Sequence, residues 1–275
     1  MPELPEVETV CRGLRKHIVG RTITKVVVRS DSAIHDQKMT AEDFRACVEG
    51  HKICGVRRRG KYILLALNVG CLICHLRMTG KLLVRTGDVM VGKHDHVIFY
   101  LDDAHVLLYE DVRRFGGFLW CAGDAMCNEP LSKLGPEPLE ATFNADDFFK
   151  STRKRKRPIK THLLDQHIVA GIGNIYADEI LFAAGVRPRK SAMRISRAEA
   201  AAIVDVTKRI LAEAVMAGGS TIRDYVDSEN REGTFQLSHQ VYGRAGEPCK
   251  QCGTVLKSIT VGGRSSVYCP NCQKS

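Results

Sequence analysis

The sequence lacks long apolar runs, and its acidic residues are outnumbered by basic ones. It contains no stretch of about eighteen consecutive apolar residues, so no membrane-spanning helix is predicted. The first residues are acidic and have no apolar core, which argues against a secretion signal there. In 275 residues, 31 Asp and Glu stand against 41 Lys and Arg, a formal net charge of +10. This excess indicates a polyanionic partner, most simply nucleic acid.

Cysteine, by contrast, is plentiful, with eleven residues in a chain for which no export signal is predicted. A disulfide scaffold is therefore disfavoured, and metal ligands together with reduced thiols fit better. Cys249 and Cys252 form one C-x-x-C pair, and Cys269 and Cys272 form another, with sixteen residues between the two pairs. This spacing predicts a tetrahedral four-thiolate zinc site, which is structural because no coordination position stays open. A pair of disulfides is the alternative.

Apolar periodicity predicts an N-terminal antiparallel β-sandwich flanked by helices. From Leu4 to about His17 apolar residues recur every three or four positions, which predicts a helix that ends before Gly20. Short apolar segments between turn residues then predict many strands, a pattern typical of a sandwich. The predicted strands are 22–29, 53–58, 62–67, 71–76, 82–85, 97–101, 106–109 and 117–121, with one short helix at 41–48.

A segment rich in Gly, Pro and Asn separates this part from a helical part. Helices are predicted at 145–150, 159–167, 175–184 and 197–217, a loop at 218–240, and a β-hairpin at 256–268 that turns at Gly262-Gly263. The predicted organisation is a β-sandwich domain at 1–122, a linker at 123–140, a helical domain at 141–239 and a zinc-finger β-hairpin at 240–275.

The first residues could carry covalent chemistry. Methionine before a small residue is normally removed, so the mature chain would begin with Pro2. An α-amino group titrates at about 7.7–8.0, and a helix N-terminus lowers this value further, which favours the nucleophilic form. Such an amine can attack a carbonyl carbon and form a Schiff base, and Glu3 is adjacent to move protons. The alternative is that Pro2 and Pro5 only start a helix.

Cations and glycines indicate a phosphate site in the helical part. Seven Lys and Arg occupy the eleven residues from 150 to 160. Gly171 and Gly173 then lead into a predicted helix at Asn174, so that backbone N–H groups can approach a phosphate. Together they predict contacts to a nucleic-acid backbone, with a solvated charged face as the alternative. Arg264 follows the hairpin turn, where it could enter a nucleic-acid groove.

Three further motifs lie in the predicted sandwich. Lys61 follows a run of arginines at the start of a strand, beside a possible cleft. His94 is part of a His-Asp-His triplet without further ligands at metal spacing, so a phosphate-binding or hydrogen-bonded histidine is predicted. Arg113 and Phe115 share a predicted loop, where the ring would fill an opened base stack or be buried in a hairpin.

These motifs together resemble the bacterial formamidopyrimidine-DNA glycosylase family. The resemblance spans the chain and includes Pro-Glu-Leu-Pro-Glu-Val-Glu-Thr at the N-terminus, Lys61-Tyr62, Lys93-His94-Asp95-His96, Arg113-Arg114-Phe115-Gly116, Leu134-Gly-Pro-Glu-Pro, Gly171-x-Gly-Asn174, Gln240-Val-Tyr-Gly-Arg and the zinc ribbon with Arg264. It implies a multidomain α and β fold: an N-terminal β-sandwich, a helix–two-turn–helix domain and a C-terminal zinc finger.

The resemblance also implies an activity. Such an enzyme removes oxidised purines (8-oxoguanine, formamidopyrimidines) from duplex DNA through a Schiff base, then cleaves the strand by β,δ-elimination. Pro2 would be the nucleophile and Glu3 the acid, with Lys61 and Arg264 serving the first and second elimination. The implied DNA contacts are His94, Arg113, Arg155, Lys160 and Asn174, with Met78, Arg113 and Phe115 as the wedge that replaces the everted base. Residues 220–225 resemble the lid over that base.

The resemblance further implies one structural zinc ion per chain, no organic cofactor, damaged double-stranded DNA as partner, no membrane, a monomer, and a bacterial cytoplasmic location. Two alternatives stay open. The sister branch acts on oxidised pyrimidines but begins Pro-Glu-Gly-Pro-Glu, whereas Leu4 stands here. A non-catalytic zinc-ribbon DNA-binding protein is the second alternative. Arg77, before Met78, departs from the small residue expected there.

Overall fold

The computed structural model describes residues 1–36, 39–220, 228 and 233–274. The chain divides into two compact units. The first comprises Met1–Ser132 together with Ala217–Thr234, and the second Lys133–Met216 together with Phe235–Ser275. The boundary after Ser132 lies inside the segment predicted as a linker. Among the described residues, no helix is long and apolar enough to span a membrane.

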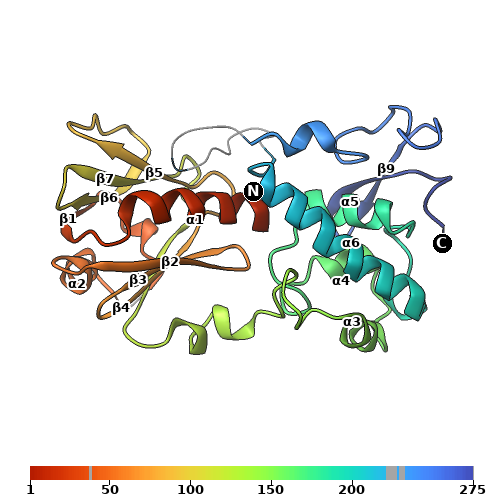
Figure 1. Cartoon of the computed structure of the whole chain (residues 1–275), viewed down its shortest axis with the longest axis horizontal. Coiled ribbons are helices and arrows are strands. Elements are labelled where there is room, and N and C mark those ends of the chain that lie inside the picture. Colours follow the sequence, from red (N-terminus) through yellow and green to blue (C-terminus); the bar gives the residue numbers. More distant parts are fainter. Residues whose placement is uncertain (37–38, 221–227, 229–232, 275) are drawn as a thin grey trace. The chain divides into compact units, whose positions relative to one another are not determined.

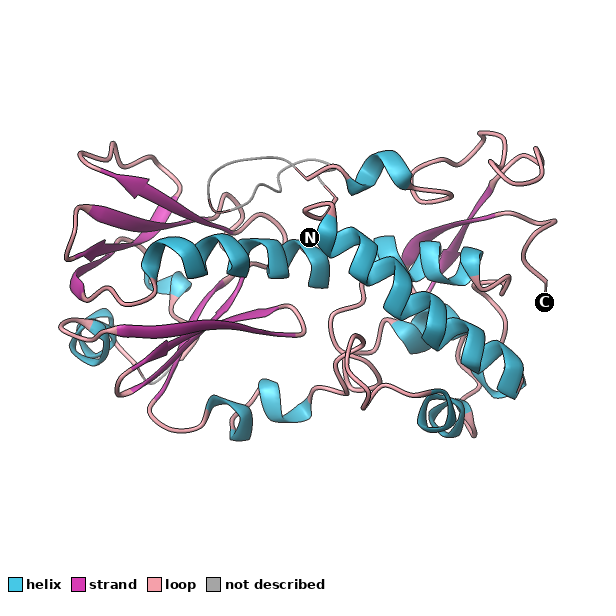
Figure 2. Cartoon of the chain, in the orientation of Figure 1, coloured by secondary structure: helices cyan, strands magenta, loops and turns pink. Residues whose placement is uncertain are grey.

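Among the residues that the structure describes, the first unit contains two four-stranded antiparallel sheets, shown in magenta in Figure 2. One sheet has the order β1 (Ile23–Val28), β6 (Asp95–Leu101), β7 (His105–Glu110) and β5 (Lys81–Thr86). The other has the order β2 (Ile53–Arg59), β3 (Tyr62–Leu67), β4 (Gly70–His75) and β8 (Gly117–Cys121). Each predicted strand is present to within one or two residues at its ends, so the sandwich prediction is confirmed.

One apolar core joins both sheets with two helices, α1 (Leu4–Ile18) and α2 (Ala41–Val48). In α1 the buried apolar residues recur at helical spacing, and Figure 1 shows this helix running alongside the sheets. Phe118 contributes from one sheet and Phe99 from the other, with their ring centroids 5.2 Å apart at 69°. Edge-to-face ring packing of this kind stabilises the sandwich beyond the area it buries.

In the second unit the described residues form four α-helices, namely α3 (Ala145–Thr152), α4 (Ile159–Leu163), α5 (Asn174–Ala183) and α6 (Arg197–Met216), and a hairpin of β9 (Lys257–Val261) and β10 (Arg264–Tyr268). The prediction of a helix to residue 167 was wrong, because α4 ends at Leu163. Asp165 turns the chain there: its side chain accepts a hydrogen bond from the backbone N–H of His167 at 3.0 Å. Short 3-10 turns were not predicted; they occupy Asp31–Ala33, Ala125–Cys127, Leu131–Lys133, Ala192–Arg194 and Phe235–Ser238.

Two buried carboxylates on α5 hold the C-terminal segment. Asp178 pairs with the Nζ of Lys160 at 2.8 Å and accepts hydrogen bonds from Ser266 Oγ and the N–H of Val267. Burial raises the pKa of Asp178, while the Lys160 ammonium opposes that change. The neighbouring Glu179 accepts three backbone N–H bonds, from residues 240, 241 and 242, at 2.8–3.0 Å. The hairpin is therefore anchored to α5 by satisfied charges and not by apolar packing alone.

Candidate active site and nucleic-acid interface

The N-terminus is held in a buried position at the start of α1. Glu3 is the N-cap of this helix, with Pro2 buried beside it. A capping box joins Glu3 and Glu6: the Glu3 side chain accepts from the Glu6 backbone, and Glu6 Oε2 accepts from the Glu3 N–H at 2.8 Å. Glu6 Oε1 also accepts from the Ser220 N–H at 2.7 Å. Pro2 thus lies at the positive end of a helix, next to a carboxylate of fixed orientation.

The approach of residues 219 and 220 to Glu6 requires a glycine. Gly219 has a φ of +79°, and a Cβ there would lie 2.8 Å from Glu6 Oε1. Ser220 itself is buried. The remaining residues predicted as a lid, 221–225, lie outside the described residues.

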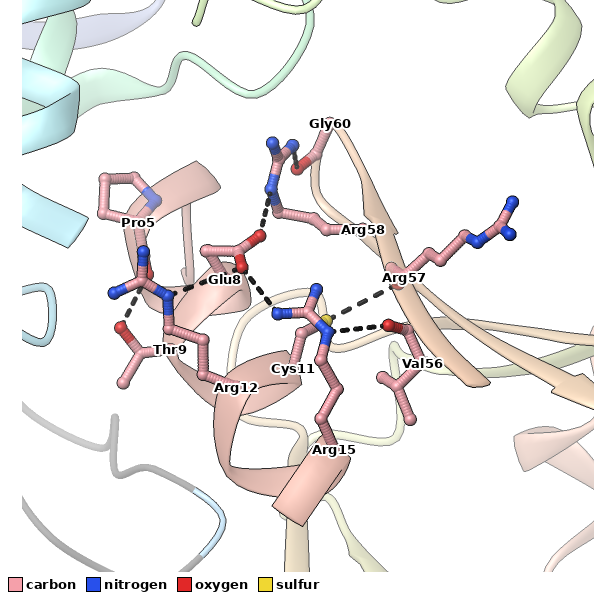
Figure 3. A network of polar contacts seen from close by, with 10 residues as sticks. All are labelled: Pro5, Glu8, Thr9, Cys11, Arg12, Arg15, Val56, Arg57, Arg58 and Gly60. Carbon is pink, nitrogen blue, oxygen red and sulfur yellow. Dashed lines mark hydrogen bonds and ion pairs between the residues drawn. The ribbon is translucent and has the colours of Figure 1, made fainter. Parts of the chain in front are cut away.

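A salt-bridge network ties the β2–β3 hairpin to α1 (Figure 3). Glu8 on α1 binds Arg15 at 3.0 Å and Arg58 at 3.1 Å. The Arg58 Nη1 also donates to the carbonyl oxygen of Gly60 at 3.1 Å, and Gly60 adopts a φ of +55° that favours glycine. Lys61 follows directly and is only 6% exposed. The turn before Lys61 is therefore fixed to the helix that starts at Glu3.

His75 belongs to the same area, and the sequence interpretation missed it. It pairs with Tyr62 across β3 and β4, and the two rings meet edge-on at 4.5 Å. Burial, with the charges of Arg77 and Lys61, lowers the pKa of His75 to about 3. Its Nδ1 accepts from the Arg77 N–H at 2.9 Å, so the neutral ring carries its proton on Nε2 and can donate. His75 lies opposite Tyr62, the residue after Lys61, only through the register of β3 and β4, so the sequence carried no signal that could have identified it.

The loops that carry the predicted wedge meet at the buried side chain of Asp111. Its Oδ1 accepts from Thr79 Oγ1 and from the Arg113 N–H, and its Oδ2 accepts from Tyr109 Oη and from the Gly116 N–H. Burial opposes ionisation, but these hydrogen bonds outweigh it and lower the pKa of Asp111. One carboxylate therefore positions the loop after β4 and the loop after β7 together.

Met78 and Phe115, which stand on these two loops, are exposed, with 40% and 53% of their surface accessible. The alternative of a Phe115 buried in a hairpin is therefore wrong. The Arg113 guanidinium lies over the Phe115 ring at 4.5 Å, which places a cation against the exposed aromatic face. Arg77 and Arg114 have φ values of 51° and 56°, unusual for residues other than glycine. Such conformations persist where the surrounding contacts enforce them.

The two histidines of the His-Asp-His triplet differ in their surroundings. His96 is buried and its Nε2 bonds the carbonyl oxygen of Asp111 at 2.8 Å, so this ring is a hydrogen-bonded histidine. His94 is half-buried, and its carbonyl oxygen accepts the Asp111 N–H at 3.0 Å. His94 therefore lies beside the loops that Asp111 positions, and its contact with DNA stays a prediction.

The residues of the second unit that are predicted to contact DNA differ in their exposure and in their hydrogen bonds. Arg155 is exposed after α3, and Arg264 is exposed at the start of β10, just beyond the Gly262-Gly263 turn. Asn174 begins α5, and its Nδ2 donates to the Ser265 carbonyl oxygen at 3.1 Å. Lys160 also donates to this oxygen, at 2.8 Å, and is fully buried. A phosphate contact by Lys160 would therefore require its pair with Asp178 to rearrange.

The four predicted zinc ligands form one cluster. The Sγ atoms of Cys249, Cys252, Cys269 and Cys272 all lie within 4.8 Å of one another. Cys249 and Cys272 are 3.9 Å apart, and Cys252 and Cys269 are 3.5 Å apart, far beyond a disulfide bond. Zn–S bonds of about 2.3 Å in a tetrahedron give S···S distances of about 3.8 Å, which this cluster matches. The disulfide alternative is wrong, and the cluster is a structural zinc site.

Hydrogen bonds prepare one of these thiols for a metal. Hydrogen bonds from Thr254 and Asn271 lower the pKa of Cys252 to about 5. The ligand form of cysteine is the thiolate, so this environment favours the ligand form of Cys252. Burial raises the pKa values of Cys269 and Cys272 in the same cluster, so the thiolate form is not favoured at every ligand. The site has four thiolate donors and no open position, which assigns zinc to the fold and not to a reaction step.

Comparison with known proteins agrees with this arrangement over the whole chain. The model of the formamidopyrimidine-DNA glycosylase N-terminal domain matches residues 1–118, and that of the H2TH domain of the same enzymes matches residues 134–226. A zinc finger found in FPG and IleRS matches residues 246–274. The chain belongs to the formamidopyrimidine-DNA glycosylase family. The predicted family and enzyme class, a DNA glycosylase, are thereby confirmed.

Individual relatives are similar along their full length. Formamidopyrimidine-DNA glycosylases of Thioalkalivibrio sulfidiphilus and Streptococcus pneumoniae are each 45% identical, with at least 99% of both chains covered. A crystal structure of a Lactococcus lactis FPG mutant with Fapy-dG containing DNA matches with a TM-score of 0.93 and 38% identity, covering 100% of both chains. The Thermus thermophilus MutM (Fpg) structure matches with a TM-score of 0.88 and 39% identity, covering 99% of this chain and 98% of that one. The predicted fold class is confirmed.

The zinc site yields a direct test. Cys269→Ser removes one of four thiolates, so the variant should lose zinc, and with it the ordered hairpin and DNA binding. The matched control is Cys71→Ser, which replaces a buried thiol on β4 outside the cluster and should keep the metal. Zinc per chain is measured by atomic absorption, and DNA binding by fluorescence anisotropy. A Cys269→Ser protein with one zinc ion and unchanged DNA affinity would contradict the assignment.

Proposed function

We propose that this chain excises oxidised purines (8-oxoguanine and formamidopyrimidines) from duplex DNA and then cleaves the strand as an abasic-site lyase. The observation that carries the proposal is the buried Pro2 at the positive end of α1, beside the fixed carboxylate of Glu3. Removal of Met1 would make this proline a secondary amine with nucleophilic character. The Lactococcus lactis Fpg structures with Fapy-dG or abasic-site DNA support the choice of substrate.

The proposed reaction uses few groups. The Pro2 nitrogen attacks C1′ of the damaged nucleotide, the N-glycosidic bond breaks, and the base leaves with a proton for which Glu3 is the donor or relay. The Pro2 nitrogen loses its proton, the C1′–O4′ bond opens with protonation of O4′, and an iminium forms between Pro2 and C1′. This iminium acidifies the C2′ hydrogen, and removal of that hydrogen as a proton expels the 3′ phosphate, a step assigned to Lys61. Loss of a second proton then expels the 5′ phosphate, a step assigned to Arg264. Hydrolysis of the remaining iminium frees Pro2.

DNA handling would rely on the exposed wedge and on cations. The damaged nucleotide must leave the base stack before C1′ can be reached, and a weakened pair is easier to open. Met78, Arg113 and Phe115 would form the wedge that fills the vacated space. His94, Arg155, Asn174 and, after rearrangement, Lys160 would contact the backbone, and His75 Nε2 adds a donor beside Lys61. We propose that the protein acts as a monomer on chromosomal DNA in the bacterial cytoplasm.

A second lesion class is also supported by a specific observation. A Lactococcus lactis Fpg structure, 37% identical to this chain with a TM-score of 0.92, contains DNA with an oxidised pyrimidine. Leu4, where the sister branch has glycine, favours purines. Comparing excision of 8-oxoguanine with that of thymine glycol in matched duplexes separates the two substrate preferences.

The Schiff base is tested by borohydride trapping on duplex DNA that contains 8-oxoguanine. Protein with a C-terminal tag and Met1 removed should form a covalent adduct, because borohydride reduces the iminium to a stable amine. The matched protein with an N-terminal tag has an amide at Pro2 and should bind the duplex without forming an adduct. Equal trapping of both proteins would refute Pro2 as the nucleophile, and trapping of neither would favour a non-catalytic DNA binder.

Arg264 is tested through the distribution of products. Arg264→Ala should keep base removal and the first elimination but leave more product that still carries the sugar fragment, because the second elimination slows. Lys257→Ala, at an exposed cation on the same hairpin, is the control and should keep the wild-type product ratio. Denaturing gels separate the two products. An unchanged product ratio in Arg264→Ala would remove this residue from the mechanism.

Asp111 is tested as a positioning residue. Asp111→Asn replaces one carboxylate oxygen, which accepts two hydrogen bonds, by an amide NH2 group that cannot accept them. Leaving the buried donors without an acceptor costs about 1–3 kcal/mol. Excision of 8-oxoguanine should fall about tenfold or more by this measure, whereas cleavage of preformed abasic DNA, which needs no base eversion, should change little. Asp88→Asn, at an exposed carboxylate, is the control. Equal loss of both activities in Asp111→Asn would argue for damage to the fold instead.

A further inference from the structure

The second unit contains a cavity of about 420 Å³ whose lining residues lie outside the set predicted to contact DNA. One wall is the segment after α5, residues 187–191, with Arg194. The other wall is the hairpin, which contributes Ile259 from β9 and Tyr268 from β10. The volume falls in the range of small-molecule sites, about 300–1,000 Å³.

The walls are fixed by hydrogen bonds to backbone oxygens. The Arg187 guanidinium donates to the carbonyl oxygens of Gln273 at 2.9 Å and Pro270 at 3.0 Å. Arg189 donates to the Thr260 carbonyl oxygen at 3.1 Å, which joins the segment to the hairpin. Ser191 Oγ donates to the Lys156 carbonyl oxygen at 3.1 Å. The cationic side chains are therefore partly ordered before any ligand arrives, which reduces the entropy lost on binding.

The cavity has an excess of positive charge. Four cations line it (Arg187, Arg189, Lys190 and Arg194), and no carboxylate is among the lining residues. Lys190 is paired with Glu199 at 2.7 Å, and Glu199 is not one of the residues that line the cavity. For the three arginines, the described part of the chain provides no carboxylate within ion-pair distance, and carbonyl oxygens do not neutralise a guanidinium. Three uncompensated charges around one concave surface attract an anion, and low-dielectric walls concentrate their field.

We propose that this cavity binds the phosphate group of a nucleotide. Arginine matches phosphate geometry with two parallel N–H donors, and the exposed Arg194 and Arg189 are the groups placed to supply them. Pro188, Ile259 and Tyr268 add apolar surface beside the cations, which suits the sugar or base attached to the phosphate. Binding of an isolated inorganic anion such as sulfate would not require this apolar surface.

The phosphate could come from either of two sources with the same chemistry: a free nucleotide, or a nucleotide of a DNA strand beyond the lesion. The free nucleotide arm is independent of the proposed excision activity. If the phosphate belongs to DNA, the proposed site depends on DNA binding but not on the Schiff base. Borohydride trapping measures Schiff-base formation in a separate experiment. Failure of this site and failure of the proposed reaction are therefore distinguishable.

The experiment compares Arg194→Glu and Arg189→Glu with Arg209→Glu, an equal charge reversal at an exposed arginine of α6 outside the cavity. Zinc content and circular dichroism establish that each variant is folded, and the Gln substitution at the same position replaces any charge-reversal variant that is not. Calorimetry measures the binding of ADP and pyrophosphate. Anisotropy measures DNA affinity against salt for a short duplex around the lesion and a longer one.

A free nucleotide as the source predicts that ADP binds wild type, and that either cavity variant weakens it about tenfold or more, while Arg209→Glu does not. DNA as the source predicts no ADP binding. In that case the salt slope for the longer duplex alone should fall by about 1 in the cavity variants, one phosphate contact each. Neither effect, or an equal effect in Arg209→Glu, would overturn the proposal.

Discussion

The structure depends on a set of buried carboxylates that are satisfied by backbone N–H groups, some of them far away in the sequence. Glu6 accepts from residues 3 and 220, and Asp111 accepts from residues 113 and 116. Asp178 and Glu179 accept from residue 267 and from residues 240–242. A buried charge left without partners costs about 3–5 kcal/mol, so these contacts are hard to give up. Glu6, Asp111 and Asp178 also fix the terminus, the loops and the hairpin that carry proposed functional residues.

This arrangement explains how flexible parts of a chain can hold reactive groups in place. The N-terminus, the loops after β4 and β7, and the zinc hairpin are positions where a chain is usually mobile. Here each is attached to a helix or sheet through charge-assisted hydrogen bonds, which are about twice as strong as neutral ones. The exposed wedge and the strained Arg77 and Arg114 conformations persist because Asp111 and His75 hold the adjacent backbone.

The net positive charge is also distributed by structure and not by sequence position. Within the basic run from 150 to 160, Lys160 is fully buried and bonded to Asp178, whereas Arg155 is exposed. Arg194, which lies outside that run, joins other cations around a cavity. A run of like charges in the sequence therefore does not define a binding surface, because partners from other segments neutralise some members and leave others available.

Several features followed from the sequence alone. The strand pattern, the α1 helix and the four zinc ligands were predicted correctly because periodicity and C-x-x-C spacing are local properties. The role of His75, the burial of Lys160 and the clustering of loops on Asp111 could not be predicted from one sequence. They arise from strand register and from contacts between residues far apart in the chain, which local patterns do not encode. Tertiary structure alone decided which charges are buried, which are paired and which are exposed.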